Sequence, residues 1–157
     1  TINGPFGTFY LREKENPIVC IAGGRGLAPI KAILEGGVND QIKRDVIFLF
    51  GARTQADLYS LKEIEDIKNN WNKDSSFQFI PVLNMEPEDS DWKGARGMVT
   101  DYFEQEVIPK QNLDINGWQA YLCGPPPMVD AASVCLTKNG ISEDEIFYDK
   151  FTDSSNL

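Results

Sequence analysis

The chain has 157 residues, of which 41% are hydrophobic, and this is enough for one domain with a buried core. Its formal net charge of −9 argues against nucleic acid or an anionic membrane surface as a partner, because both attract basic proteins. The sequence has no histidine, which excludes a histidine base or metal ligand, and no apolar run approaches the ~20 residues that span a bilayer.

Apolar runs alternate with helix-like segments along the chain, and this order is typical of a parallel α/β sheet. Buried strands are predicted at 17–22, 46–50, 77–83, 120–123 and 146–148. Helices are predicted at 27–35, 57–70, 98–108 and 125–139. We therefore expect a five-stranded parallel sheet flanked by helices.

The predicted helix ends depend on local signals. Gly36 and Gly37 would close the first helix, and Pro109 would stop the third. A capping box at 54–57 would start the second helix, whose apolar stripe is Leu58, Leu61, Ile64 and Ile67. The acidic segment 84–97, which contains a proline, is expected to be a loop.

Cys20, Cys123 and Cys135 are odd in number and far apart in sequence. This spacing matches no disulfide framework, zinc site or iron–sulfur ligand set. We therefore expect reduced thiols in a cytoplasmic protein and no metal site.

A glycine-rich turn follows the first strand, where residues 21–34 read IAGGRGLAPIKAIL. Gly23, Gly24 and Gly26 would let backbone N–H groups approach an anion, and the N-terminus of the next helix adds partial positive charge. Pro29 costs little there, because first-turn N–H groups have no partner within the helix. A tight strand-to-helix turn without a ligand is an equally good interpretation of this motif alone.

A second turn, Cys123 to Met128, follows the fourth predicted strand. Ligands collect at the carboxyl ends of strands in an open parallel sheet, so both turns would face one crevice. Cys123 could instead be a small buried hydrophobic residue, the usual fate of a free cysteine.

Two further features are ambiguous when taken alone. Residues 51–54, Gly-Ala-Arg-Thr, follow the second strand, where a ribose or adenosine could lie, although Arg53 could equally be a surface residue. Phe147, Tyr148 and Phe151 could belong to the core or stack on a planar ligand.

Six motifs occur in a fixed order along the chain. They are G-P-F-G-T-F at 4–9, A-G-G-R-G-L-A-P at 22–29, G-A-R-T-Q-A-D-L-Y at 51–59, W-K-G-A-R-G-M-V-T-D at 92–101, C-G-P-P-P-M at 123–128 and F-Y-D-K-F at 147–151. This series resembles the pyridine-nucleotide half of the ferredoxin–NADP reductase superfamily. The branch it resembles most is the reductase components of bacterial multicomponent monooxygenases and aromatic-ring dioxygenases.

The resemblance implies electron transfer from NAD(P)H through FAD to an iron–sulfur centre. Gly23, Gly24 and Gly26 would hold the pyrophosphate. Cys123 would lie near the nicotinamide carbon that gives up hydride, as the catalytic candidate. Because hydride passes directly between two cofactors, no general base is needed. The implied cofactor-binding set is Gly23, Gly24, Arg25, Gly26, Leu27, Ala28, Pro29, Gly51, Ala52, Arg53, Asp57, Gly124, Pro125, Pro126, Met128 and Phe151.

Phe151 would be the C-terminal aromatic that covers the flavin in this family, with Tyr148 as the second candidate. The family usually has threonine at the position of Arg25. The guanidinium there could grip the pyrophosphate or crowd the nicotinamide.

The resemblance also implies further domains. Residues 1–12 would be the end of an FAD-binding barrel, whose last strand is 4–11, and 13–157 the NAD(P)-binding domain. FAD would be bound by the neighbouring barrel, and a 2Fe-2S cluster by a ferredoxin domain or partner. An oxygenase component would accept the electrons. Alone, the chain is expected to bind nucleotide but transfer nothing.

NADH is expected rather than NADPH. NADP-specific relatives hold the 2′-phosphate with a Ser-Arg pair after the third strand. Here Val82-Leu83-Asn84 is followed by Glu86, Glu88 and Asp89, whose carboxylates would repel that phosphate, although Arg53 could still compensate.

Two other functions stay open. One is an electron-transfer subunit like those of dihydroorotate dehydrogenase or sulfite reductase, but such relatives carry a C-terminal cysteine cluster and no cysteine follows Cys135. The other is a non-catalytic nucleotide-binding module.

Overall fold

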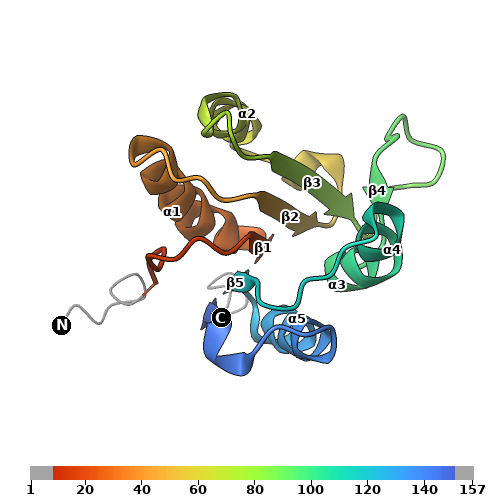
Figure 1. Ribbon diagram of the computed structural model, residues 1–157. Coiled ribbons are helices and arrows are strands. Elements are labelled where there is room, and N and C mark those ends of the chain that lie inside the picture. The colour runs from red at the N-terminus through yellow and green to blue at the C-terminus, as the bar shows by residue number, and fades with distance from the viewer. Residues whose placement is uncertain (1–8, 151–157) are drawn as a thin grey trace.

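Six parallel strands form the centre of the fold in the computed structural model, which describes residues 9–150. The strands are β1 (Ile18–Gly23), β2 (Val46–Ala52), β3 (Phe77–Leu83), β4 (Ala95–Arg96), β5 (Gln119–Gly124) and β6 (Ile146–Lys150). They lie in the order β4-β3-β2-β1-β5-β6 (Figure 1). All five predicted strands are confirmed. The sixth strand, β4, pairs with the end of β3. It has only two residues, which is too short to leave a pattern in the sequence.

Helices cover both faces of this sheet. On one face lie α1 (Leu27–Asn39) and α2 (Leu61–Asn70), and on the other lie α3 (Val99–Tyr102), α4 (Ile108–Gln111) and α5 (Pro126–Lys138) (Figure 1). A π-helical turn, Phe103–Val107, joins α3 to α4. No helix within residues 9–150 is long and apolar enough to cross a membrane.

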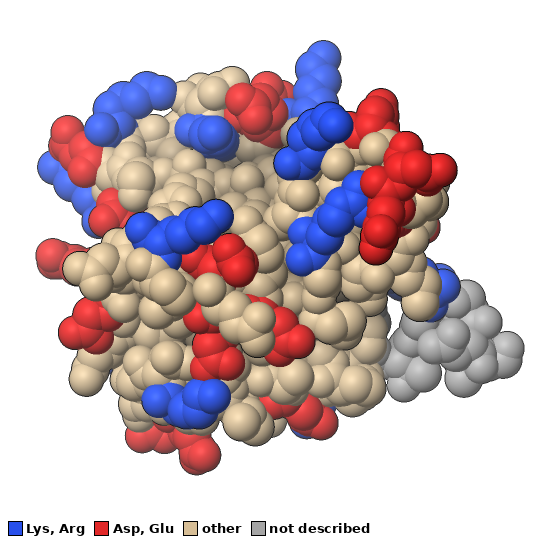
Figure 2. Space-filling view, turned by 90° about the vertical axis from the view of Figure 1, so that its right-hand side faces the viewer, with Lys and Arg blue, Asp and Glu red and all other residues tan. Residues whose placement is uncertain are grey.

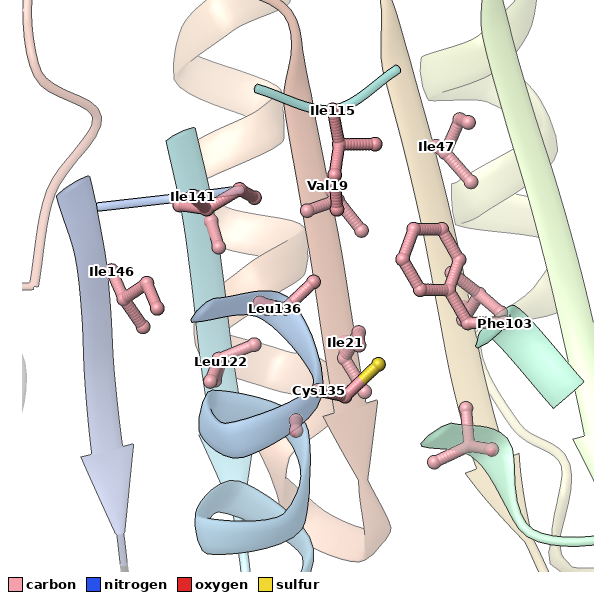
Figure 3. Close-up of a cluster of buried hydrophobic side chains, with 14 of the residues drawn as sticks. Val19, Ile21, Ile47, Phe103, Ile115, Leu122, Cys135, Leu136, Ile141 and Ile146 are labelled. Atoms are coloured by element: carbon pink, nitrogen blue, oxygen red, sulfur yellow. The ribbon is translucent and has the colours of Figure 1, made fainter. Parts of the chain in front are cut away.

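The two faces divide the buried residues into two core layers. In β1, Val19 and Ile21 face α3 and α5, whereas Ile18, Cys20 and Ala22 face α1 and α2. Figure 3 shows the first layer, with Cys135 and Leu136 of α5 lying against the strands. Because both faces are covered, the central strands are apolar at every position, unlike strands with one wet face.

The prediction that Gly36 and Gly37 close α1 is wrong, because the helix continues through both to Asn39. Gly37 is buried, and a Cβ there would lie 2.7 Å from the ring of Trp71. The glycine therefore allows the helix to pack closely against an aromatic residue and does not end it.

The prediction for the second helix is partly wrong. The Asp57 carboxylate accepts 3.1 Å hydrogen bonds from the N–H and hydroxyl of Thr54, but this box caps a short 3₁₀ turn, Gln55–Asp57. Ser60 then adopts a left-handed φ of 57°, and α2 begins only at Leu61. Leu61 is 42% exposed, so Ile64 and Ile67 alone form the buried part of the stripe within α2.

The third helix does not stop before Pro109. The N–H of Ile108 already bonds the carbonyl of Phe103, five residues back, so the helix has widened before the proline is reached. Proline lacks an N–H and disrupts a regular α-helical ladder, whereas here it lies in the first turn of α4.

A buried arginine secures the amino edge of the sheet. Arg44 is 3% exposed, and its guanidinium donates to the carbonyls of Asn16 (2.6 Å) and Arg12 (2.9 Å) and to Oε1 of Gln119 (2.6 Å). The Tyr121 hydroxyl donates to the same Gln119 oxygen and accepts from the N–H of Arg12. The segment before β1 is thereby fastened to β5.

Replacing Arg44 should destabilise the fold without touching the opposite edge. Arg44→Ala leaves three acceptors without this donor, and we expect the free energy of unfolding to fall by about 3 kcal/mol in urea denaturation. Lys43→Ala is the control, because Lys43 is exposed, and it should change stability by less than about 0.5 kcal/mol. Equal effects of the two substitutions would contradict the role of Arg44.

Candidate functional site

The strand order reverses between β1 and β5. The chain builds β2, β3 and β4 on one side of β1, then returns to place β5 and β6 on the other. A 3₁₀ turn, Gly24–Gly26, follows β1, and the turn at Gly124 and Pro125 follows β5. Both turns therefore lie at the carboxyl ends of neighbouring strands, the place where open parallel sheets bind ligands.

The two turns are in direct contact. A side chain at Gly26 would overlap the carbonyl oxygen of Cys123, and a Cβ at Gly124 would lie 3.2 Å from the backbone N and O of Gly23. Met128 packs beside this contact, where any side chain at Gly23 would meet its sulfur. Glycine at these positions is thus a requirement of packing between β1 and β5.

The first turn presents uncovered backbone. Gly24 has a φ of 55°, and no atom lies within 4 Å of the position that a Cβ would take there. Helix α1 begins directly afterwards, with no side-chain cap and no acidic residue in its first turn. Leu27 and Pro29 are buried and anchor the helix, while Arg25 and Ala28 are exposed. Uncapped N–H groups at a helix N-terminus suit an anion.

The second turn has a different chemistry. Cys123 is 0% exposed, and burial, followed by the Asp149 carboxylate, raises the pKa of its thiol to about 12. The thiol is neutral at physiological pH and is not set up as a nucleophile. Pro125, Pro126 and Pro127 contribute no N–H donors, so this turn is rigid and poor in donors.

The segment after β2 is held by its own hydrogen bonds. Gly51 and Ala52 end the strand, and a Cβ at Gly51 would lie 3.0 Å from Val99. Arg53 is exposed. Asp57 belongs to the Thr54 capping interaction described above, so it shapes this turn.

The acidic loop after β3 is fastened to this turn. The Glu86 carboxylate accepts from the N–H of Gln55 (2.8 Å) and from its side-chain amide (2.7 Å), and these bonds hold the pKa of Glu86 below its usual range. Asp91 accepts from the same amide at 2.9 Å. Arg96 donates to the carbonyls of Glu86 and Trp92 and thereby closes the loop.

A family model for the oxidoreductase NAD-binding domain matches residues 20–134. The chain belongs to this family. The match includes both turns, the segment after β2 and the acidic loop, so the geometry above is that of an NAD-binding domain.

Similar proteins come from the group that the motifs indicated, the reductase components of oxygenases. The electron transfer component of xylene/toluene monooxygenase from Pseudomonas putida is 47% identical over 151 residues, covering 96% of this chain and 41% of the relative. The reductase component of propane 2-monooxygenase from Mycolicibacterium smegmatis is 41% identical over 156 residues, covering 96% and 42%. The crystal structure of the cytochrome P450 reductase of Amycolatopsis superposes with a TM-score of 0.79 at 34% identity, covering 96% and 43%.

These comparisons confirm the predicted resemblance to oxygenase reductases and favour it over the dihydroorotate dehydrogenase and sulfite reductase alternative. They also show that the chain spans only about two-fifths of the relatives it matches, 41% to 43% of their length.

Basic side chains accompany the acidic ones at the carboxyl edge of the NAD-binding domain. Four cations stand just after or at the ends of strands: Arg25, Arg53, Arg96 and Lys150. Figure 2 views the side toward which β2 and β3 point in Figure 1 and shows Lys and Arg side chains around a hollowed area of uncharged residues. Of these cations, Arg25 lies in the turn after β1, where its charge favours an anionic ligand.

Two residues of this site, Asp149 and Tyr59, were not singled out from the sequence. Asp149 pairs with Cys123 in the β5–β6 register, and its Oδ2 atom is buried without a hydrogen-bond partner among residues 9–150. Burial raises the pKa of this carboxyl group. Tyr59 donates to the Gly24 carbonyl at 2.8 Å. Both lie inside quoted motifs, but only the fold shows what they face. Phe151 lies outside the described residues.

Substituting Gly26 tests the contact between the turns. Gly26→Ala places a methyl group against the Cys123 carbonyl, and we expect the free energy of unfolding to fall by about 3 kcal/mol. Gly36→Ala is the matched control in the same region of the chain. Gly36 lies within α1 with open space around its Cβ position, so this change should stabilise by about 0.5–1 kcal/mol. If Gly26→Ala left the free energy of unfolding unchanged, the two turns would not be in contact.

Thiol reactivity tests the cysteine environment. All three cysteines are free and buried, and burial raises the pKa of each thiol, in Cys135 to about 11. We expect negligible alkylation by iodoacetamide near neutral pH in the folded domain, followed by modification of all three in denaturant, measured by mass spectrometry. Rapid labelling of Cys123 in the native state would contradict its enclosed position.

Proposed function

We propose that this domain binds NADH and positions its nicotinamide for hydride transfer to a flavin, within a longer reductase that supplies electrons to an oxygenase. The observation that carries the proposal is the contact between two chemically different turns at the switch point of the sheet. One turn suits an anion and the other suits a flat, weakly polar ring. A dinucleotide contains both groups.

The first turn is proposed to bind the pyrophosphate. Its uncovered backbone at Gly24 and the uncapped start of α1 supply N–H donors and partial positive charge. Arg25 is exposed in this turn and adds a cation next to the expected phosphates. Of the two roles predicted for Arg25, its place in the anion turn supports the grip on the pyrophosphate.

The second turn is proposed to hold the nicotinamide ring, which when bound supplies the hydride. Pro125, Pro126 and Met128 would exclude water from the ring without offering competing donors. The neutral thiol of Cys123 would pack beneath it, and the unpartnered Asp149 oxygen would accept a hydrogen bond from a polar substituent. None of these groups needs to gain or lose a proton.

The loop after β3 supports NADH over NADPH. Gln55 holds the Glu86 and Asp91 carboxylates beside the segment that contains Arg53. Glu86, like any glutamate without a raised pKa, is ionised at neutral pH, and a 2′-phosphate would meet this negative charge.

The remaining assignments concern the longer protein. We propose that FAD binds to a barrel that ends within residues 1–12, that Phe151 covers the flavin, and that a 2Fe-2S cluster lies in a ferredoxin domain or partner. The relatives are named as electron transfer and reductase components of oxygenases, which supports an oxygenase as the acceptor. The free, buried cysteines support a cytoplasmic location.

Nucleotide titration tests the proposal. We expect NADH and ADP-ribose to raise the melting temperature, and NADPH to bind at least ~10-fold more weakly than NADH in calorimetry. Glu86→Gln should narrow this preference, whereas Glu63→Gln, an exposed change on α2, should leave it intact. If NADH, NADPH and ADP-ribose all fail to bind, the proposed function is wrong.

A further inference from the structure

We propose that Tyr59 is a positioning residue for the pyrophosphate turn, orienting the peptide between Gly24 and Arg25 through its hydroxyl group. The inference rests on the proposed function and identifies a residue through which the anion site is built. The Tyr59 hydroxyl donates a 2.8 Å hydrogen bond to the Gly24 carbonyl, although the two residues are 35 positions apart.

The ring of Tyr59 packs against a strand of the sheet. Its ring packs edge-on against Phe50, with centroids 5.8 Å apart and an interplanar angle of 85°. Phe50 lies in β2 and is completely buried. On the chain, Tyr59 stands between the capped 3₁₀ turn at 55–57 and Ser60, whose left-handed backbone starts α2. Rigid elements therefore fix where the hydroxyl lies.

The hydrogen bond has a consequence for the neighbouring donor. In a trans peptide the C=O and N–H groups point in opposite directions. Holding the Gly24 carbonyl on Tyr59 thus sets the direction of the Arg25 N–H, one of the donors expected to face the pyrophosphate. Gly24 has a φ of 55° and open space at its Cβ position, so no packing on that side restrains this peptide. Without the hydroxyl, this peptide keeps only the restraints of the 3₁₀ turn, and glycine adds little restraint of its own.

The surroundings keep this hydroxyl a donor. Burial raises the pKa of Tyr59, while the Arg25 guanidinium acts in the opposite sense. Tyr59 is therefore protonated at neutral pH. The side chain is nevertheless 41% exposed, so packing alone does not account for its position at the crevice.

Tyr59→Phe removes the hydroxyl and keeps the ring against Phe50. Binding of ADP-ribose, which contains the pyrophosphate, is measured by calorimetry, and binding of AMP, which lacks it, by NMR titration. We expect ADP-ribose to bind about fivefold to tenfold more weakly, the usual loss for one hydrogen bond, and AMP to change less than about twofold. Tyr10→Phe is the control, because Tyr10 is an exposed tyrosine stacked on Arg12, far along the chain from this turn.

The outcomes separate the two proposals. If the wild-type domain does not bind ADP-ribose, the proposed function fails and the inference fails with it. If the wild type binds and Tyr59→Phe binds equally well, the inference is overturned while the proposed function stands. An equal loss for AMP and ADP-ribose would also overturn it, because the effect would then not involve the pyrophosphate turn.

Discussion

The site depends on a backbone contact that leaves no room for a side chain, the approach of Gly26 to the carbonyl of Cys123. This contact joins the turns that follow β1 and β5, two strands that are adjacent in the sheet although about 100 residues separate them in sequence. Because the strands are parallel and in register, their carboxyl ends lie at one edge. The close approach then places the two turns against each other at that edge.

The two turns differ in chemistry as the proposed dinucleotide site requires. In the proposed site, the uncapped helix N–H groups and Arg25 would bind a phosphate, and the proline-rich backbone and neutral thiol would contact an aromatic ring. Neither turn contains a base or a reactive nucleophile, and hydride transfer between cofactors needs none. The proposed site would therefore act through position and electrostatics.

The hydrogen bonds that stabilise the fold lie at the amino edge of the sheet, and the turns proposed to bind the nucleotide lie at the carboxyl edge. At the amino edge, Arg44 and Gln119 use their hydrogen bonds to fasten the segment before β1. At the carboxyl edge, glycines and Tyr59 shape an open backbone. The hydrogen bonds that fasten the fold and the turns proposed to bind the nucleotide therefore lie at opposite ends of the strands.

Local sequence signals were sufficient to predict an element where the residue type has one structural use. The five longer strands follow from apolar runs that only a doubly covered sheet explains, and both turns follow from glycine or proline after a strand. The same reasoning failed at Gly36, Gly37 and Pro109. There a glycine served close packing on Trp71, and a π-helical turn absorbed a proline.

The sequence by itself determined the layer architecture, the family and the two turns, because these depend on the order of residues along short segments. Only the tertiary structure decided that Cys123 is enclosed, that Asp149 faces it from β6, and that Tyr59 holds the Gly24 peptide. These contacts join residues from different strands and loops. Their partners are set by strand order and register, which no local pattern of residues records.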